Sequence, residues 1–175
     1  EGLVRDAAEL SVGHARTRLV VAERGQIVTV KLQRPFSSAE LTRNFYATSS
    51  CGVCGKAALE HVAVLADPLA AGPIVPRAVI LGLPPQLRAA QVAFEATGGL
   101  HAAGWFDDHG RLCAIREDVG RHNALDKLLG RALLDGALPL SQAIVLVSGR
   151  ASFELVQKAA VAGVTVLAAV SAPSS

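Results

Sequence analysis

The sequence predicts an α/β fold with three layers, in which helices cover both faces of a mixed sheet. Two apolar runs, 143–147 and 164–170, flank a helical segment over 151–162. Neither run alternates apolar with polar residues, which is typical of strands buried on both faces of a sheet. A strand, a helix and a strand in succession indicate a right-handed crossover between parallel neighbours. The length of 175 residues fits one domain with a sizeable core.

Proline and glycine set the limits of two further helices. A helix over 86–97 is expected to begin after Pro84-Pro85 and to end at Gly98-Gly99. A second helix is predicted over 123–134, and it ends before Gly136.

Two pairs of strands are predicted around short turns. The first is a hairpin of 19–22 with 26–32, and the second joins 101–106 to 111–116 through the turn 107–110. The hairpin divides the expected domain into a small β region, 1–35, and a main region, 36–175.

Composition narrows the class of function. A net charge of +2, with the charges dispersed, argues against a nucleic-acid partner. No apolar run reaches the length of a membrane span, and we expect no signal peptide. Three cysteines make a poor disulfide framework and suit a reducing, cytoplasmic compartment. The chain has no methionine, so we expect a fragment or a processed form of a longer protein.

Two thiols, Cys51 and Cys54, lie in a loop with glycines at positions 52 and 55 and with Lys56 beside them. Helices are expected on both sides of this loop, over 38–47 and 56–65, and a mobile loop follows over 69–77. This spacing of thiols suits metal binding, disulfide exchange or a persulfide. A thiol at a helix N-terminus near a lysine is expected to have a lowered pKa, which favours sulfur chemistry.

Four residues, Ser148, Gly149, Arg150 and Ser152, form a predicted turn from a buried strand into a helix. Ligands of α/β proteins bind at the carboxyl ends of such strands, and free N–H groups with an arginine suit a phosphate. The alternative is an ordinary serine-capped helix with a salt-bridged arginine.

The densest polar stretch runs over 118–127 and contains Gly120, Arg121 and His122. His122 and Asp126 are four residues apart, so the two side chains could pair on one helix face. The alternative is an ordinary helix start in which Asp118 or Asn123 is the capping residue, with surface charges around it.

His101 invites comparison with zinc deaminases, which use His-x-Glu and a later Pro-Cys-x-x-Cys. Here Ala103 replaces the glutamate and Ser50 replaces the proline, so deamination is not expected. His101 could join the two loop cysteines as a metal ligand, although a core or cleft histidine is the simpler interpretation. The third cysteine, Cys113, is expected to pack within a strand as a small hydrophobe.

Four blocks of this sequence, 50–56, 97–103, 116–127 and 148–158, closely resemble the formate dehydrogenase accessory sulfurtransferase family in content, order and spacing. The resemblance implies a cytidine-deaminase-like α/β/α fold without deaminase chemistry. It also implies that a cysteine desulfurase loads sulfur onto Cys51, with Cys54 matching the second family cysteine. The sulfur would pass to the molybdenum cofactor, a bis(molybdopterin guanine dinucleotide), which is handed to apo-formate dehydrogenase.

The same resemblance implies a homodimer, no tightly bound metal, and a chain shortened at both ends relative to the family. The segments around Arg121 and Ser148 would then contact the pyrophosphate and guanine nucleotide of the cofactor in one cleft with the cysteine loop. Two other functions stay open: a chaperone that holds the cofactor without sulfur transfer, and a zinc hydrolase of deaminase type.

Overall fold

The computed structural model describes residues 10–14, 28–32 and 68–173, so the predicted cysteine loop and both of its helices lie outside the described residues. The main body is built on a four-stranded sheet of order β4-β3-β5-β6. Its strands are β3 (His101–Phe106), β4 (Leu112–Asp118), β5 (Ile144–Arg150) and β6 (Val166–Ser171). Strand β3 is antiparallel to both β4 and β5, whereas β5 and β6 are parallel, which confirms a mixed sheet in an α/β fold.

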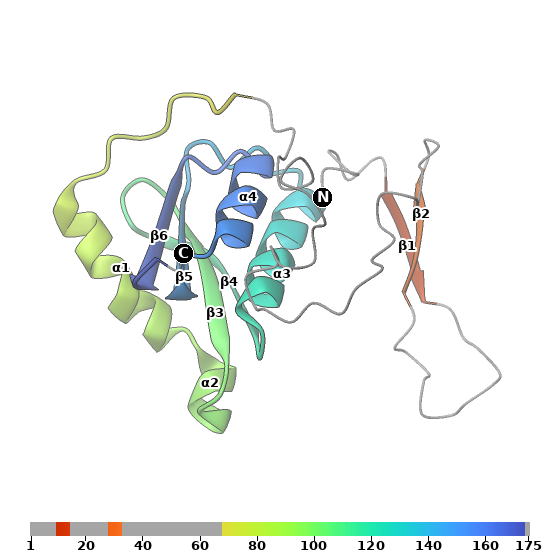
Figure 1. Ribbon diagram of the computed structural model, residues 1–175, viewed down its shortest axis with the longest axis horizontal. Coiled ribbons are helices and arrows are strands. Elements are labelled where there is room, and N and C mark those ends of the chain that lie inside the picture. The colour runs from red at the N-terminus through yellow and green to blue at the C-terminus, as the bar shows by residue number, and fades with distance from the viewer. Residues whose placement is uncertain (1–9, 15–27, 33–67, 174–175) are drawn as a thin grey trace.

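Helices cover both faces of this sheet (Figure 1). Helix α1 (Arg77–Ala89) packs on one face, and α3 (Arg121–Leu134) with α4 (Phe153–Val161) packs on the other. Successive residues of a strand point to opposite faces, so β5 serves both cores. The core under α1 contains Leu83, Leu87, Ala102, Phe106, Ile144 and Leu146. The core under α3 and α4 includes Ala103, Leu125, Leu128, Val145, Val147 and Leu155.

The predicted strand–helix–strand unit at the end of the chain is present, with shifted limits. Strand β5 continues to Arg150, and α4 begins at Phe153. The expected turn at 148–152 is therefore shorter than predicted, because Ser148, Gly149 and Arg150 belong to the strand.

The predicted helix 86–97 is wrong in its limits. Helix α1 begins after Pro76 and contains Pro84 and Pro85, and a separate helix, α2 (Val92–Thr97), follows it. The break occurs because Gln91 leaves the helical region of backbone space, with φ −81° and ψ 78°. A proline does open α1, as the sequence argument assumed, but it is the earlier one.

Strand β4 holds α2 in place. The carboxylate of Glu117 accepts hydrogen bonds from the N–H groups of Ala93, at 2.9 Å, and Phe94, at 2.8 Å. A six-residue helix is too short to be stable alone, so these bonds satisfy donors that its first turn leaves unpaired. The helix ends at Gly98, whose φ of +69° suits glycine, and the chain then enters β3 at His101.

The predicted strands around the turn 107–110 are confirmed within two residues. The carboxylate of Asp107 accepts the N–H groups of His109 and Arg111 and closes that turn. Cys113 lies in β4 as expected, but it is exposed rather than packed. Strand β4 is at the edge of the sheet, where one of its faces is only partly covered.

A separate two-stranded sheet pairs β1 (Leu10–His14) with β2 (Val28–Leu32) in antiparallel register. The second arm of the predicted hairpin is thus confirmed over 28–32, but its partner is β1. The predicted first arm, 19–22, lies outside the described residues. Among the helices that the structure describes, none combines the length and the apolar character needed to cross a bilayer.

Candidate functional site

Four elements meet at the carboxyl end of β5. Strand β3 begins there, β5 ends there, and α3 and α4 both start there, as the lower part of the sheet in Figure 1 shows. We call this place the β5 junction and define it by six residues. They are His101, Arg121, His122, Ser148, Gly149 and Ser152. Five of the six are residues that the sequence predicted as ligand-binding.

Ser148 extends the pairing of β3 with β5 by one step. The last backbone pair in the register is Ala103 with Val147. One residue further on, the N–H of Ala102 donates to the Ser148 hydroxyl oxygen at 2.8 Å, so a side chain replaces a strand carbonyl as acceptor. The same oxygen lies 3.5 Å from His101 Nδ1. A hydroxyl keeps its own proton for one further acceptor, which can be that ring nitrogen or a ligand oxygen.

Gly149 gives two basic side chains room to approach the same backbone unit. A Cβ atom at this position would lie 3.3 Å from His101 Nδ1 and 3.4 Å from Arg121 Cδ. The φ of Gly149 is not among the positive values in the described chain, so space rather than backbone conformation requires glycine here. Strand β3 and helix α3 therefore present His101 and Arg121 together at the end of β5.

Ser152 does not cap helix α4. It is the N-cap residue by position, yet its side chain makes no capping hydrogen bond. Its hydroxyl instead lies 3.2 Å from His122 Nε2, and the residue is only 1% exposed. The alternative of an ordinary serine cap is wrong, because the hydroxyl is used to link α4 to α3.

His122 is held between the two helices and close to several charges. Its Nε2 lies 3.3 Å from Glu154 Oε2, and the histidine side chain is 20% exposed. Burial lowers the pKa of His122 below its ordinary value of 6.5; Arg121 and Lys158 lower it further, while Glu154 and Asp126 oppose the shift. The ring is therefore neutral at neutral pH.

The predicted pairing of His122 with Asp126 is wrong. Asp126 instead pairs with Lys158 of α4, whose Nζ lies 2.5 Å from its carboxylate. The same ammonium lies 3.8 Å from Glu154, so the charges form a chain across α3 and α4. The i,i+4 rule identifies which side chains can meet on one helix, but the neighbouring helix offers each of them a closer partner.

Asp118 fixes the segment that leads into α3. Its carboxylate accepts from the N–H of Gly120 at 2.9 Å and from the Asn123 amide at 3.1 Å. Lys127 donates to it at 2.5 Å, and this bond is the largest of the causes that lower the pKa of Asp118 to about 2. The N-cap residue is Gly120, and no side chain makes a capping hydrogen bond to α3. The alternative of a helix cap by Asp118 or Asn123 is therefore wrong.

Two of the predicted ligand-binding residues lie outside the junction. Gly120 precedes Arg121 at the start of α3, and Arg150 is exposed at the end of β5. Conversely, the sequence suggested His101 only as an alternative metal ligand and assigned no role to Glu154. The signal for His101 was its place at the start of a strand, two residues after a glycine pair, and the signal for Glu154 was its spacing of four from Lys158.

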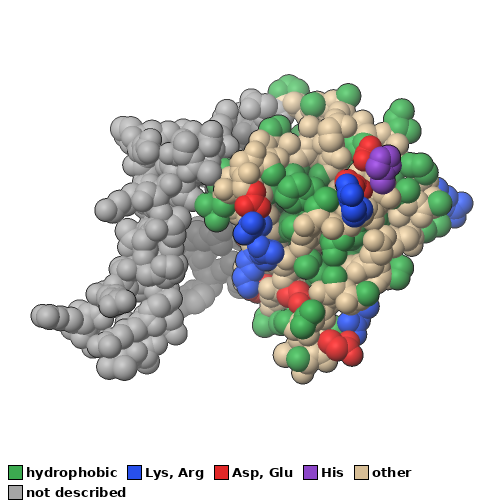
Figure 2. Space-filling view, turned by 180° about the vertical axis from the view of Figure 1, so that it is seen from behind, with side chains coloured by type: hydrophobic (Ala, Val, Ile, Leu, Met, Phe, Trp, Pro, Cys, Tyr) green, Lys and Arg blue, Asp and Glu red, His purple; other side chains and the backbone are tan. Residues whose placement is uncertain are grey.

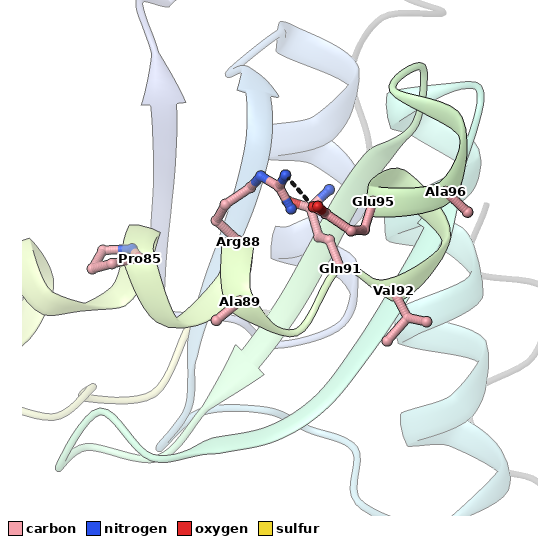
Figure 3. Close-up of a pocket in the computed structure, with 7 residues that line it drawn as sticks. All are labelled: Pro85, Arg88, Ala89, Gln91, Val92, Glu95 and Ala96. Carbon is pink, nitrogen blue, oxygen red and sulfur yellow. Dashed lines mark hydrogen bonds and ion pairs between the residues drawn. The ribbon is translucent and has the colours of Figure 1, made fainter.

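The structure also contains a shallow pocket between α1 and α2, and no predicted site residue is among the residues that line it (Figure 3). Arg88 and Glu95 form an ion pair of 2.6 Å along it. The lining residues are Pro85, Arg88, Ala89, Gln91, Val92, Glu95 and Ala96. Its ionic groups satisfy one another, so the pocket offers no unpaired charge to a ligand.

Charge is mixed over the described surface. On the face shown in Figure 2, acidic and basic side chains lie next to each other between apolar ones, without a broad area of one sign. Within the described ranges, no group of three or more His, Cys, Asp or Glu could hold a metal ion. The alternative of a metal site formed by His101 with Cys51 and Cys54 is not tested, because both cysteines lie outside those ranges.

Comparison with known proteins places the chain in a family. The model of the FdhD/NarQ family matches residues 1–175. The sulfur carrier protein FdhD of Streptomyces avermitilis is 60% identical over 139 residues, which are 77% of this chain and 49% of that protein. FdhD of Corynebacterium efficiens is 42% identical over 185 aligned residues, which cover 100% of this chain and 66% of that protein.

Among solved structures, a protein from Desulfotalea psychrophila described as a formate dehydrogenase accessory protein matches with a TM-score of 0.56 and 34% identity. The match covers 63% of this chain and 46% of that chain. The chain spans about half the length of most of the curated relatives it matches. With a family match over its whole length, the chain belongs to the FdhD/NarQ family.

Proposed function

We propose that this chain carries sulfur for the maturation of formate dehydrogenase. The observation that supports this most directly is its likeness to proteins named as sulfur carriers, at up to 60% identity over 139 residues. The likeness to a formate dehydrogenase accessory protein points to the same process. Cys51 is the proposed sulfur carrier, and Cys54 is its neighbour at the second family position.

The proposed reaction begins with a cysteine desulfurase that bears a persulfide. The Cys51 thiolate attacks the outer sulfur of that persulfide, a new S–S bond forms on Cys51, and the desulfurase thiolate leaves. The sulfur then passes to a molybdenum cofactor of the bis(molybdopterin guanine dinucleotide) type, which is the substrate, for delivery to apo-formate dehydrogenase. In this proposal the carrier acts in the cytoplasm and as a homodimer.

The β5 junction is the proposed place for the nucleotide part of that substrate. Arg121 and the exposed Arg150 supply positive charge, and the Ser148 hydroxyl supplies a donor for a phosphate oxygen. Gly120 and Gly149 are proposed to contact the ligand through their backbone, while His122 and Ser152 are the proposed contacts deeper in the junction. Such an arrangement at the carboxyl end of a strand is typical of nucleotide-binding α/β proteins.

The architecture proposed for the complete domain is a three-layer fold of cytidine-deaminase type. Helices on both faces of a mixed sheet support it. Deaminase chemistry is not proposed, because Ala103 occupies the place of the catalytic glutamate. A small β region over 1–35 and a main region over 36–175 remain the proposed division of the chain.

Intact mass measurement tests the sulfur-carrying step. The protein, Cys51→Ala and Cys54→Ala are each incubated with an active cysteine desulfurase and cysteine. We expect the unsubstituted protein to gain the mass of one sulfur atom, reversibly on reduction, and Cys51→Ala to gain none. If no form gains sulfur while the desulfurase is active, a chaperone that only holds the cofactor becomes the better interpretation.

A further inference from the structure

The contacts of His122 decide which of its two ring nitrogens carries the proton. Nε2 lies 3.2 Å from the Ser152 hydroxyl and 3.3 Å from a carboxylate oxygen of Glu154. Both neighbours are on the same nitrogen, so this is not the nucleophilic triad, in which the serine and the carboxylate contact opposite nitrogens.

A proton on Nε2 satisfies both neighbours at once. The N–H donates to the serine oxygen and is attracted by the adjacent carboxylate. A lone pair on Nε2 would instead face the negative oxygen of Glu154 at 3.3 Å, which is repulsive. The side chains of His122 and Glu154 are only 20% and 23% exposed, so water can relieve that repulsion only in part.

We propose that Ser152 and Glu154 are positioning residues that hold His122 as the Nε2–H tautomer, so that Nδ1 is the acceptor atom the β5 junction offers to a hydrogen-bond donor of the ligand. The first half of this proposal concerns the protein alone. The acceptor role of Nδ1 rests on the proposed nucleotide site. It adds a hydrogen-bond acceptor, for an N–H or O–H of the ligand, to the groups that bind its phosphates.

The charges around His122 agree with this assignment. Glu154 and Asp126 carry negative charge towards the ring, and Arg121 and Lys158 carry positive charge. Lys158 pairs with Asp126 and lies 3.8 Å from Glu154, so the carboxylate beside Nε2 belongs to a network of opposite charges. A neutral ring with its proton on Nε2 has Nδ1 unprotonated, which is the state that accepts a hydrogen bond.

The tautomer can be observed without any ligand. Long-range proton–nitrogen correlation spectra of the full-length protein with isotopically labelled histidine report which ring nitrogen is protonated, and His122→Asn identifies the signals of His122. At neutral pH we expect Nε2 protonated and Nδ1 unprotonated. A predominant Nδ1–H tautomer, or a charged ring, would overturn the proposal.

Two matched variants test the positioning residues. Glu154→Gln removes the carboxylate that faces Nε2, and it is expected to increase the share of the Nδ1–H tautomer. Asp126→Asn makes the same change in charge on the same network but leaves both neighbours of Nε2 in place, so the tautomer is expected to stay. Ser152→Ala gives a second test from the other side. If neither Glu154→Gln nor Ser152→Ala alters the tautomer, these residues do not position the ring.

Binding of guanosine diphosphate, measured by calorimetry, tests the acceptor role. An asparagine at 122 can place its amide oxygen near the former Nδ1, whereas a glutamine reaches the former Nε2. We expect His122→Gln to bind about two- to tenfold more weakly than His122→Asn, the usual effect of one lost hydrogen bond. Equal binding by both variants would overturn the acceptor role. No binding by wild type would instead contradict the proposed nucleotide site and leave the tautomer result unaffected.

Discussion

Replacement of Gly149 by alanine tests how closely the side chains of the β5 junction pack against this residue. The new Cβ would lie 3.3 Å from His101 Nδ1, and 3.4 Å from both His101 Cε1 and Arg121 Cδ. Carbon contacts are most favourable at about 3.5–4.0 Å, so each neighbour must move by a few tenths of an ångström. Both neighbours are side chains, which can move without shifting the sheet.

Two effects on stability oppose each other in Gly149→Ala. Overpacking costs about 1–3 kcal/mol, and the low end applies because the crowded atoms belong to side chains. Replacement of glycine restricts the unfolded chain and returns about 0.4–1 kcal/mol. We therefore expect a net loss of at most about 1 kcal/mol, or a fall in Tm of about 2–4 °C. Ligand affinity is expected to fall by up to about tenfold, the effect of one weakened hydrogen bond, because His101 and Arg121 are both displaced from the end of β5.

Gly130→Ala is the matched control. A Cβ at Gly130 would meet nothing within 4 Å, and the residue lies inside helix α3. Alanine is expected to raise stability there by about 0.5–1 kcal/mol without changing affinity. Thermal unfolding and calorimetry with guanosine diphosphate measure the two quantities for both variants. If Gly149→Ala were stabilised like the control and bound equally well, the reasoning from crowding at the junction would be refuted.

Two further predictions concern the core and the acid limit of stability. In Gly104→Ala a Cβ would lie 2.6 Å from Leu87 Cδ1, within the core under α1. We therefore expect the free energy of unfolding, measured in urea, to fall by about 1–3 kcal/mol. An unchanged urea midpoint would contradict this packing. The pKa of Asp118 is lowered from 3.8 to about 2, first by its bond to Lys127, so its contribution to stability is present above pH 3.8 and is lost as the pH falls towards 2. Asp118→Asn is expected to remove that part of the acid dependence, and an unchanged acid-unfolding curve would count against it.

Local sequence patterns identified the strands of the main sheet and most residues of the junction. Continuous apolar runs identified β5 and β6, and the crossover helix between them followed from its length and its glycine stop. The prediction of a helix start at Pro84-Pro85 was wrong, because both prolines lie inside a helix that begins after Pro76. Local sequence does not distinguish a proline that precedes a helix from one within it.

Pairing between distant elements was the part that sequence reasoning could not supply. The preference of Asp126 for Lys158 depends on how α3 lies against α4, and the turn of Ser152 away from its own helix depends on His122. Similarly, the place of His101 in the junction follows from the register of β3 with β5, which no local pattern encodes. The cysteine loop stays a prediction from the sequence and the family.

The hydroxyl of Ser148 has a consequence for ligand selection. Its oxygen is fixed by the N–H of Ala102, so the position of the group is set by the sheet before any ligand arrives. A preorganised donor loses little conformational freedom on binding, which improves affinity for a partner that fits it. The Ser148 hydroxyl can still donate its own proton, and a phosphate oxygen would compete with His101 Nδ1 to accept it. The hydrogen bond that extends the pairing of β3 with β5 therefore favours ligands that place an acceptor oxygen next to the Ser148 hydroxyl.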